Sequence, residues 1–237
     1  MKMLVVSDLH LDAATMGVPR LPELERSLDQ AVHHAADAKV DEFVFLGDLA
    51  DPDIGSGALV RALDVLVRVV MKLRCAYGIS SKLLVGNHDV IEDGSGDTTL
   101  SPLRGIEGVT VLDHPTSWVK GDLFFVALPY TATSHGYDVR DFLAKHLTDQ
   151  PTVVLSHLAV EGIQPGEETK EMPRGREVLL PLDMLENPKH LVLQGHYHKG
   201  QTFVSPGGAQ VHVVGSLARL TFGEEGNEPG YLIVEWR

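Results

Sequence analysis

Short apolar runs that end in polar residues recur along the chain. The clearest lie at residues 3–6, 42–46, 82–85, 152–155 and 191–193, and each has the length of a buried strand rather than of a helix. Weaker strand patterns fall at residues 109–112, 117–119, 123–127, 202–204, 211–214 and 231–234. The segments at 117–119 and 123–127 are separated by a short polar turn and therefore predict a hairpin.

Three intervening segments carry apolar residues at helical spacing instead. The first begins near Pro22, a residue suited to the first turn of a helix, and its apolar residues from Leu24 to Ala35 fall on one face. The second, residues 57–77, is apolar around much of its circumference, which favours a helix buried on more than one side over a dimer interface. The third covers residues 138–146. Helices that alternate with strands predict an α/β fold.

Composition adds limits on domain organisation and compartment. The 237 residues contain no internal repeat or linker, so we expect one domain that spans residues 1–237. Cys75 is the single cysteine, which favours a reducing, cytoplasmic compartment over a disulfide-bonded one. No apolar run approaches the roughly 18 to 20 residues of a membrane span, and Asp8 comes too early for a secretory signal. We therefore expect no membrane association.

Side chains that can bind metals follow five of the predicted strands. In chain order they are Asp8 and His10, Asp48, Asn87 and His88, His157, and His196 and His198. Side chains two residues apart on an extended backbone share a face, so each close pair is expected to point one way. Imidazole, carboxylate and amide oxygen together suit Mn, Fe or Zn. A single such residue is often structural, but the recurrence at successive strand ends favours a metal site.

The same residues fall in short sequence blocks. The blocks are Asp8-x-His10, Gly47-Asp48-x-x-Asp51, Gly86-Asn87-His88-Asp89, Ser156-His157 and Gly195-His196-x-His198. Together they resemble the blocks of the calcineurin-like metallophosphoesterases, and the match extends over residues 8–198. The resemblance implies a four-layer fold, with two mixed β-sheets packed face to face and flanked by helices.

The resemblance also implies a binuclear metal centre. One metal ion would be held by Asp8, His10, Asp48 and His198, and the other by Asp48, Asn87, His157 and His196, so that Asp48 bridges them. Mn is the expected metal, with Fe, Zn, Ni and Mg as alternatives. Two such ions about 3.5 to 4 Å apart can share a hydroxide that attacks phosphorus in line while they clamp the phosphoryl oxygens.

The leaving oxygen of such a reaction needs a proton. His88 is not required as a metal ligand, so we assign it as the general acid. Asp51 would orient the His88 ring, as in relatives that share the Gly-Asp-x-x-Asp spacing. Asp89 closes its block with a role that stays open.

The substrate is less closely specified. Residues 195–201 and 215–224 resemble the SbcD-type nuclease subunits, which implies a DNA exo- or endonuclease acting with an SbcC-like ATPase partner. The net charge of −13 and the lack of a Lys/Arg-rich block count against extended DNA binding. We therefore predict a phosphodiesterase that acts on a nucleotide phosphodiester, such as a cyclic nucleotide. The alternatives are the nuclease and a metal-binding regulatory subunit with little activity, in each case as a monomer or homodimer.

Three further residues are candidates for substrate contacts. Tyr130 and Tyr197 could stack on a base, but tyrosines fill cores as often as they bind ligands. Arg219 could meet a phosphate, although a surface salt bridge is the favoured interpretation.

Overall fold

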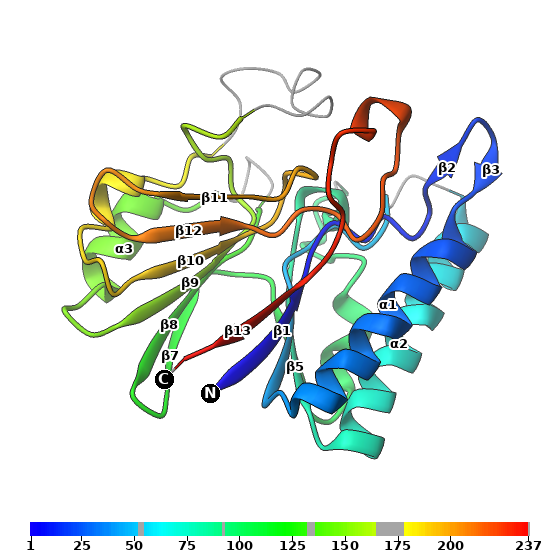
Figure 1. Cartoon of the computed structure of the whole chain (residues 1–237), viewed down its shortest axis with the longest axis horizontal. Helices are drawn as coiled ribbons and strands as arrows, with labels where there is room; N and C mark the ends of the chain where they lie inside the picture. The colour runs from blue at the N-terminus through cyan, green and yellow to red at the C-terminus, as the bar shows by residue number, and fades with distance from the viewer. Residues whose placement is uncertain (52–54, 92, 132–135, 165–177, 237) are drawn as a thin grey trace.

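Two β-sheets packed face to face form the centre of the molecule, and helices cover the outer face of each sheet (Figure 1). The computed structural model describes residues 1–51, 55–91, 93–131, 136–164 and 178–236. Helices α1 and α2 lie against one sheet and α3 lies against the other. This order of layers confirms the expected four-layer α/β fold.

The first sheet has the strand order β13-β1-β4-β5-β6. Its members are β1 (Lys2–Val6), β4 (Glu42–Phe45), β5 (Ser80–Leu84), β6 (Val109–Leu112) and β13 (Leu232–Glu235). β1, β4, β5 and β6 run parallel, whereas β13 pairs antiparallel with β1. The parallel strands therefore end at the same edge of the sheet.

The second sheet has the strand order β11-β12-β10-β9-β8-β7. Its members are β7 (Thr116–Lys120), β8 (Leu123–Leu128), β9 (Thr152–Ser156), β10 (Leu191–Gln194), β11 (Gln201–Val204) and β12 (Gln210–Val213). β8, β9, β10 and β12 are parallel, and β7 and β11 are antiparallel edges. β7 and β8 form the predicted hairpin.

Alternate residues of the strands face different cores because successive side chains of a strand point to opposite sides. In β1, Met3 and Val5 lie between the two sheets, while Leu4 and Val6 lie under the helices. β9 is divided in the same way, with Val153 between the sheets. Strands that are buried on both faces read as continuous apolar runs, which is why they were visible in the sequence.

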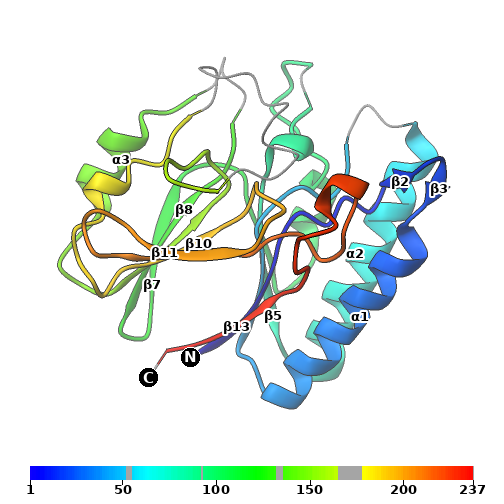
Figure 2. The same cartoon turned by 45° about the horizontal axis from the view of Figure 1, so that its top comes forward.

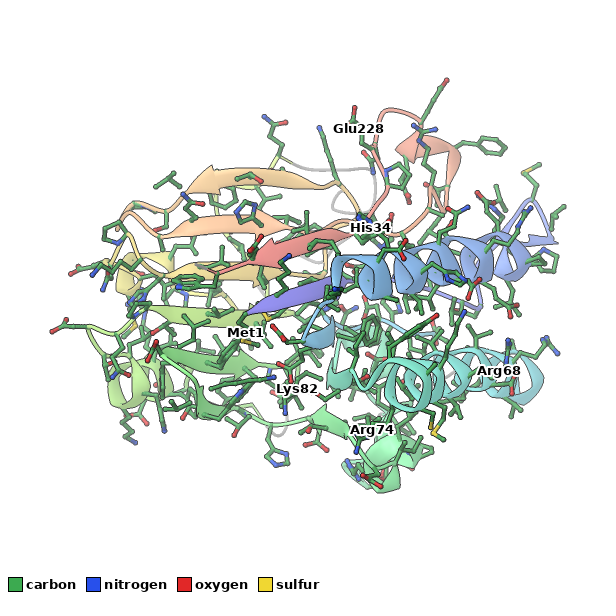
Figure 3. All side chains as sticks on the ribbon, turned by 60° about the horizontal axis from the view of Figure 1, so that its bottom comes forward. Met1, His34, Arg68, Arg74, Lys82 and Glu228 are labelled. Carbon is green, nitrogen blue, oxygen red and sulfur yellow. The ribbon has the colours of Figure 1, made fainter. Side chains whose placement is uncertain are left out.

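The helices match their predicted segments. α1 (Leu21–Ala38) buries the residues with predicted core spacing, which are Leu24, Leu28, Ala31, Val32 and Ala35. α2 (Ser56–Tyr77), which carries Arg68, packs against α1 and β5 (Figure 3). Two ion pairs of 2.7 Å join its surface to α1, one between Arg68 and Glu25 and the other between Lys72 and Asp29. α3 covers Val139–His146. Within the described residues, no helix is long and apolar enough to cross a membrane.

Several short elements have no counterpart in the sequence predictions. They are β2 (Ala14–Thr15), β3 (Val18–Pro19) and the 3₁₀ turns Asn87–Asp89, Ser101–Gly105, Leu182–Met184 and η6 (Phe222–Glu224). β2 and β3 form a hairpin whose turn residues Met16 and Gly17 both have positive φ, at 52° and 78°. Strands of two residues show no periodicity, so the hydrophobic pattern could not predict them.

A buried carboxylate, Asp89, joins the loops that follow β4 and β5. Its Oδ2 accepts hydrogen bonds from the backbone N–H groups of Asp48 and Gly86, both at 2.9 Å. Its Oδ1 accepts from the backbone of Leu49 at 3.0 Å and from the hydroxyl of Thr99 at 2.7 Å. Burial, and secondarily the nearby charge of Asp48, raises the pKa of Asp89 to about 6. Asp89 therefore holds two loops of the first sheet in a fixed relation.

Replacing Asp89 with asparagine should lower the free energy of unfolding by about 2 to 6 kcal/mol. The amide nitrogen would face two of the four donors, and each unpaired buried donor costs about 1 to 3 kcal/mol. Urea unfolding in the presence of EDTA measures the change without a metal contribution. The control is Asp37→Asn on the exposed face of α1, which should change stability by less than about 0.5 kcal/mol. Equal stabilities of the two variants would contradict the role of Asp89.

Candidate metal centre

Strands of both sheets end along one edge of the molecule, which is turned toward the viewer in Figure 2. β1, β4 and β5 come from the first sheet, and β9 and β10 come from the second. Each of the five is followed within a few residues by a predicted ligand. The fold therefore brings together residues that are far apart in sequence.

One group of candidate ligands consists of Asp8, His10 and His198. The ligand atoms of these residues lie within 4.8 Å of one another. The Nε2 atoms of His10 and His198 face each other at 3.2 Å. This group combines residues that follow β1 with one that follows β10, as the resemblance implies for the first metal ion.

The second group consists of Asp48, His157 and His196, whose ligand atoms also lie within 4.8 Å of one another. The side-chain oxygen of Asn87 joins this group, since it lies 2.8 Å from His196 Nδ1 and 3.1 Å from His157 Nε2. These four residues are those that the resemblance implies for the second metal ion.

Asp48 lies between the two groups. Its Oδ2 is 3.2 Å from His157 Nε2 in the second group and 3.7 Å from His10 Nε2 in the first. This is the placement that a bridging carboxylate requires. The structure thus gathers all seven predicted ligands, while the binding of metal by each residue stays a prediction.

The backbone reaches this arrangement through left-handed turns. Asp8 and His10 have φ values of 49° and 38°, Asp48 has 63° and His196 has 75°. The expected extended backbone is therefore wrong, because the chain already leaves the extended conformation at the first residue of each pair. Asp8 and His10 nevertheless share one group, whereas His196 and His198 lie in different groups. Non-glycine residues in this region carry strain of about 1 to 3 kcal/mol, and such residues cluster at functional sites.

Two glycines allow the loops to approach closely. A Cβ atom on Gly86 would lie 2.2 Å from Asp48 Oδ1, and one on Gly195 would lie 2.5 Å from Ser7 Oγ and 2.8 Å from His157 Nδ1. A side chain at either position would push the ligand-bearing loops apart. The glycines in these blocks are thus required by the close packing of the site.

The donor set fits divalent metal ions. Both carboxylate oxygens of Asp8 are buried without a hydrogen-bond partner of ordinary geometry among the described residues. Burial raises the pKa of Asp8, although His157 opposes the shift. Burying a carboxylate without well-formed hydrogen bonds is costly, and a cation beside it would add to the compensation that His157 provides. Nitrogen and oxygen donors of this mixture suit Mn, Fe or Zn.

The histidines differ in their charge. Burial lowers the pKa of His10 to about 3, so its ring is neutral and can donate a lone pair. Burial opposes the charged form of His157, but the attraction and hydrogen bond of Asp48 outweigh it and raise the pKa of His157 to about 9. Burial would raise the pKa of Asp48, yet His157 holds it well below its usual range. Metal binding to this pair must therefore displace a proton.

His88 lies beside the ligand groups rather than within them. Its ring centroid is 5.1 Å from that of His10, and its backbone N–H donates to Asp48 Oδ1 at 2.9 Å. Its Nδ1 is 3.7 Å from Asp51 Oδ2, which is an ion-pair distance rather than a hydrogen bond. The side chains of both His88 and Asp51 are 43% exposed, so solvent and ligands can reach them.

The three candidate substrate contacts have different surroundings. Tyr130 is half-buried, and its backbone N–H donates to the carbonyl of Val85, so it lies next to the Gly86-Asn87-His88 block. Tyr197 is only 4% exposed and its hydroxyl accepts from the backbone of Val160, which supports the packing alternative. Arg219 is exposed and its Nε donates to the carbonyl of Asn227.

Two acidic residues at the site were given no role from the sequence. Asp89 joins the loops that follow β4 and β5, as described above. In the sequence, its position directly after Asn87-His88 was the available sign of a role at the site. Glu224 is buried against His198, and its only signal was the unusual Phe222-Gly223-Glu224 segment. Neither interaction follows from a local pattern.

Solved structures with this fold include enzymes of phosphate chemistry. A dimetal phosphatase from Danio rerio has a TM-score of 0.59 at 15% identity, over 91% of this chain and 87% of that one. A purple acid phosphatase from yellow lupin (Lupinus luteus) seeds has a TM-score of 0.61 at 13% identity, over 100% of this chain and 46% of that one. A protein from Thermus thermophilus has a TM-score of 0.52 at 15% identity, over 91% of this chain and 89% of that one. At these identities the similarity shows a shared fold.

The sequence itself matches a family model. The model, described as calcineurin-like phosphoesterase, covers residues 1–200, which include every predicted ligand from Asp8 to His198. The two candidate metal groups lie within this match. The chain therefore belongs to the calcineurin-like phosphoesterase family of metal-dependent enzymes.

Proposed function

We propose that the chain is a phosphodiesterase that uses two divalent metal ions, with Mn as the expected metal, to hydrolyse a nucleotide phosphodiester. The observation that carries the proposal is the convergence of seven nitrogen and oxygen donors on one spot, with His88 beside them. Bound metal ions would supply the positive charge that lowers the pKa of water and stabilises the phosphoryl group.

The surroundings of His88 support its role as the proton donor in this proposal. It is accessible, and the hydrogen bond from its backbone to Asp48 fixes its distance from the metal centre. Its imidazolium would give a proton to the leaving oxygen, and Asp51 would orient the ring. Tyr130 is the candidate for a contact with the base, because it adjoins the His88 loop.

The charge of the chain counts against extended binding to a long nucleic acid. The chain has a net charge of −13, and DNA binding normally relies on Lys and Arg residues that neutralise phosphates. The nuclease alternative has one specific support, the similarity of residues 215–224 to SbcD-type subunits, and would involve an SbcC-like ATPase partner. The complete donor set argues against a regulatory subunit with little activity.

His88→Ala should reduce turnover by about 100- to 10,000-fold while the bound metal is retained, because the variant loses a proton donor and no ligand. The loss should be smaller for a nitrophenolate leaving group, which needs less protonation. Steady-state kinetics and elemental analysis of the bound metal measure the two effects. The matched control is His114→Ala, since the side chain of His114 is 81% exposed. Loss of metal from His88→Ala would refute the assignment.

A substrate panel under Mn²⁺ tests the function itself. We expect hydrolysis of bis-nitrophenyl phosphate and 2′,3′-cyclic AMP to exceed that of nitrophenyl phosphate and of linear DNA. Activity should disappear with EDTA, which removes metal ions. It should also disappear in Asp48→Ala, because this variant lacks the carboxylate that lies between the two candidate metal groups. Degradation of DNA alone would favour the nuclease, and failure with every substrate under several metals would favour the regulatory subunit.

A further inference from the structure

A further buried carboxylate reaches the candidate metal centre from the C-terminal part of the chain. Glu224 lies in the 3₁₀ turn η6, drawn in orange-red toward the β2–β3 hairpin in Figures 1 and 2. The hydroxyl of Thr15 in β2 donates to the carbonyl of Leu220 at 2.8 Å, which joins the two segments. Glu224 is 1% exposed, although residues on both sides of it are exposed.

The His198 ring lies between Glu224 and the first candidate metal group. Its Nδ1 is 3.2 Å from Glu224 Oε1, and its Nε2 is 3.2 Å from His10 Nε2. The two ring nitrogens thus face different partners, a carboxylate on one side and the metal-binding atoms on the other. A carboxylate accepts hydrogen bonds only, so Nδ1 must carry the proton.

We propose that Glu224 is a positioning residue that fixes the Nδ1–H tautomer and the ring orientation of His198, so that the Nε2 lone pair points toward the first metal position. Carboxylate partners of this kind also make a histidine ligand more basic, and their loss typically weakens metal binding by about 10- to 100-fold. The inference rests on the proposed metal centre but is independent of the substrate.

Glu224 is itself held in place. Its Oε2 accepts from the backbone N–H of Leu220 at 2.9 Å, and its Oε1 also accepts from the hydroxyl of Thr221 at 3.1 Å. The backbone N–H of Asn227 donates to the Glu224 carbonyl at 2.8 Å. The Nε of Arg219 donates to the Asn227 carbonyl at 2.9 Å and so further stabilises residues 219–227. The carboxylate is therefore anchored before any metal binds.

Neighbouring residues of the C-terminal part of the chain also hold the backbone of His198 in place. The N–H of Ser216 donates to the carbonyl of His198 at 3.1 Å, and Gly230 donates to the carbonyl of Ser216 at 3.1 Å. By contrast, Nδ1 of His157 in the second group faces the backbone carbonyl of Leu46. Loss of Glu224 should therefore affect the first metal position and leave the second unchanged.

Glu224→Ala should weaken the first Mn²⁺ site by about 10- to 100-fold and leave the affinity of the second within about twofold, as measured by calorimetric titration of the metal-free protein. Glu224→Gln can still accept the Nδ1 hydrogen bond and should recover part of the affinity. The matched control is Glu225→Ala, because Glu225 is the exposed neighbour. Equal weakening of both sites, or no weakening of either, would overturn the proposal.

Nitrogen-15 NMR of the metal-free wild-type protein reports the tautomer without the Glu224 variants and without any measurement of activity. The His198 signals, assigned with His198→Asn, should show a protonated Nδ1 in the wild type. A proton on Nε2 alone would overturn the proposal. If the wild type binds two Mn²⁺ ions with this tautomer but hydrolyses no substrate, the proposed function fails while the role of Glu224 stands.

Discussion

His157 joins the two sheets at the edge where the candidate ligands meet. It follows β9 of the second sheet, yet its Nδ1 donates to the Leu46 carbonyl and its Nε2 faces Asp48 at 3.2 Å, both beyond β4 of the first. The ring is fully buried, so water cannot replace either partner, and an unpaired buried group costs about 1 to 3 kcal/mol. The relative position of the two halves of the metal centre depends on this side chain.

The close approach of the two sheets strains the backbone of the loops at the site, and the strands beneath the site offset this strain. Asp8 and Asp48 adopt left-handed conformations, and Gly86 and Gly195 stand where any side chain would collide with a ligand or its neighbour. Such strain persists only where the surrounding structure over-determines it. Here the parallel strands, buried on both faces, and the four hydrogen bonds of Asp89 supply that rigidity.

The sequence predicted what depends on local periodicity. The buried face of α1 and the strands that precede the ligands follow from spacing alone, so they agree with the structure. The left-handed turns at Asp8 and His196 were not predictable, because they depend on how the loops meet. The same holds for Glu224, which reaches His198 from 26 positions along the chain within a segment of no regular pattern. The burial of Tyr197 was also not predictable from local pattern, because it depends on tertiary packing.

Asp89, Asp48 and Asp8 are buried carboxylates at this edge that are compensated to different degrees. Asp89 accepts hydrogen bonds from four donors, and Asp48 is paired with His157, whereas Asp8 has no hydrogen bond of ordinary geometry among the described residues. The protein thus stabilises the second candidate group largely by itself. In the first group, a cation beside the Asp8 carboxylate would offset the cost of burying it. Because binding to the folded chain adds to its stability, a metal ion should contribute most at the first position.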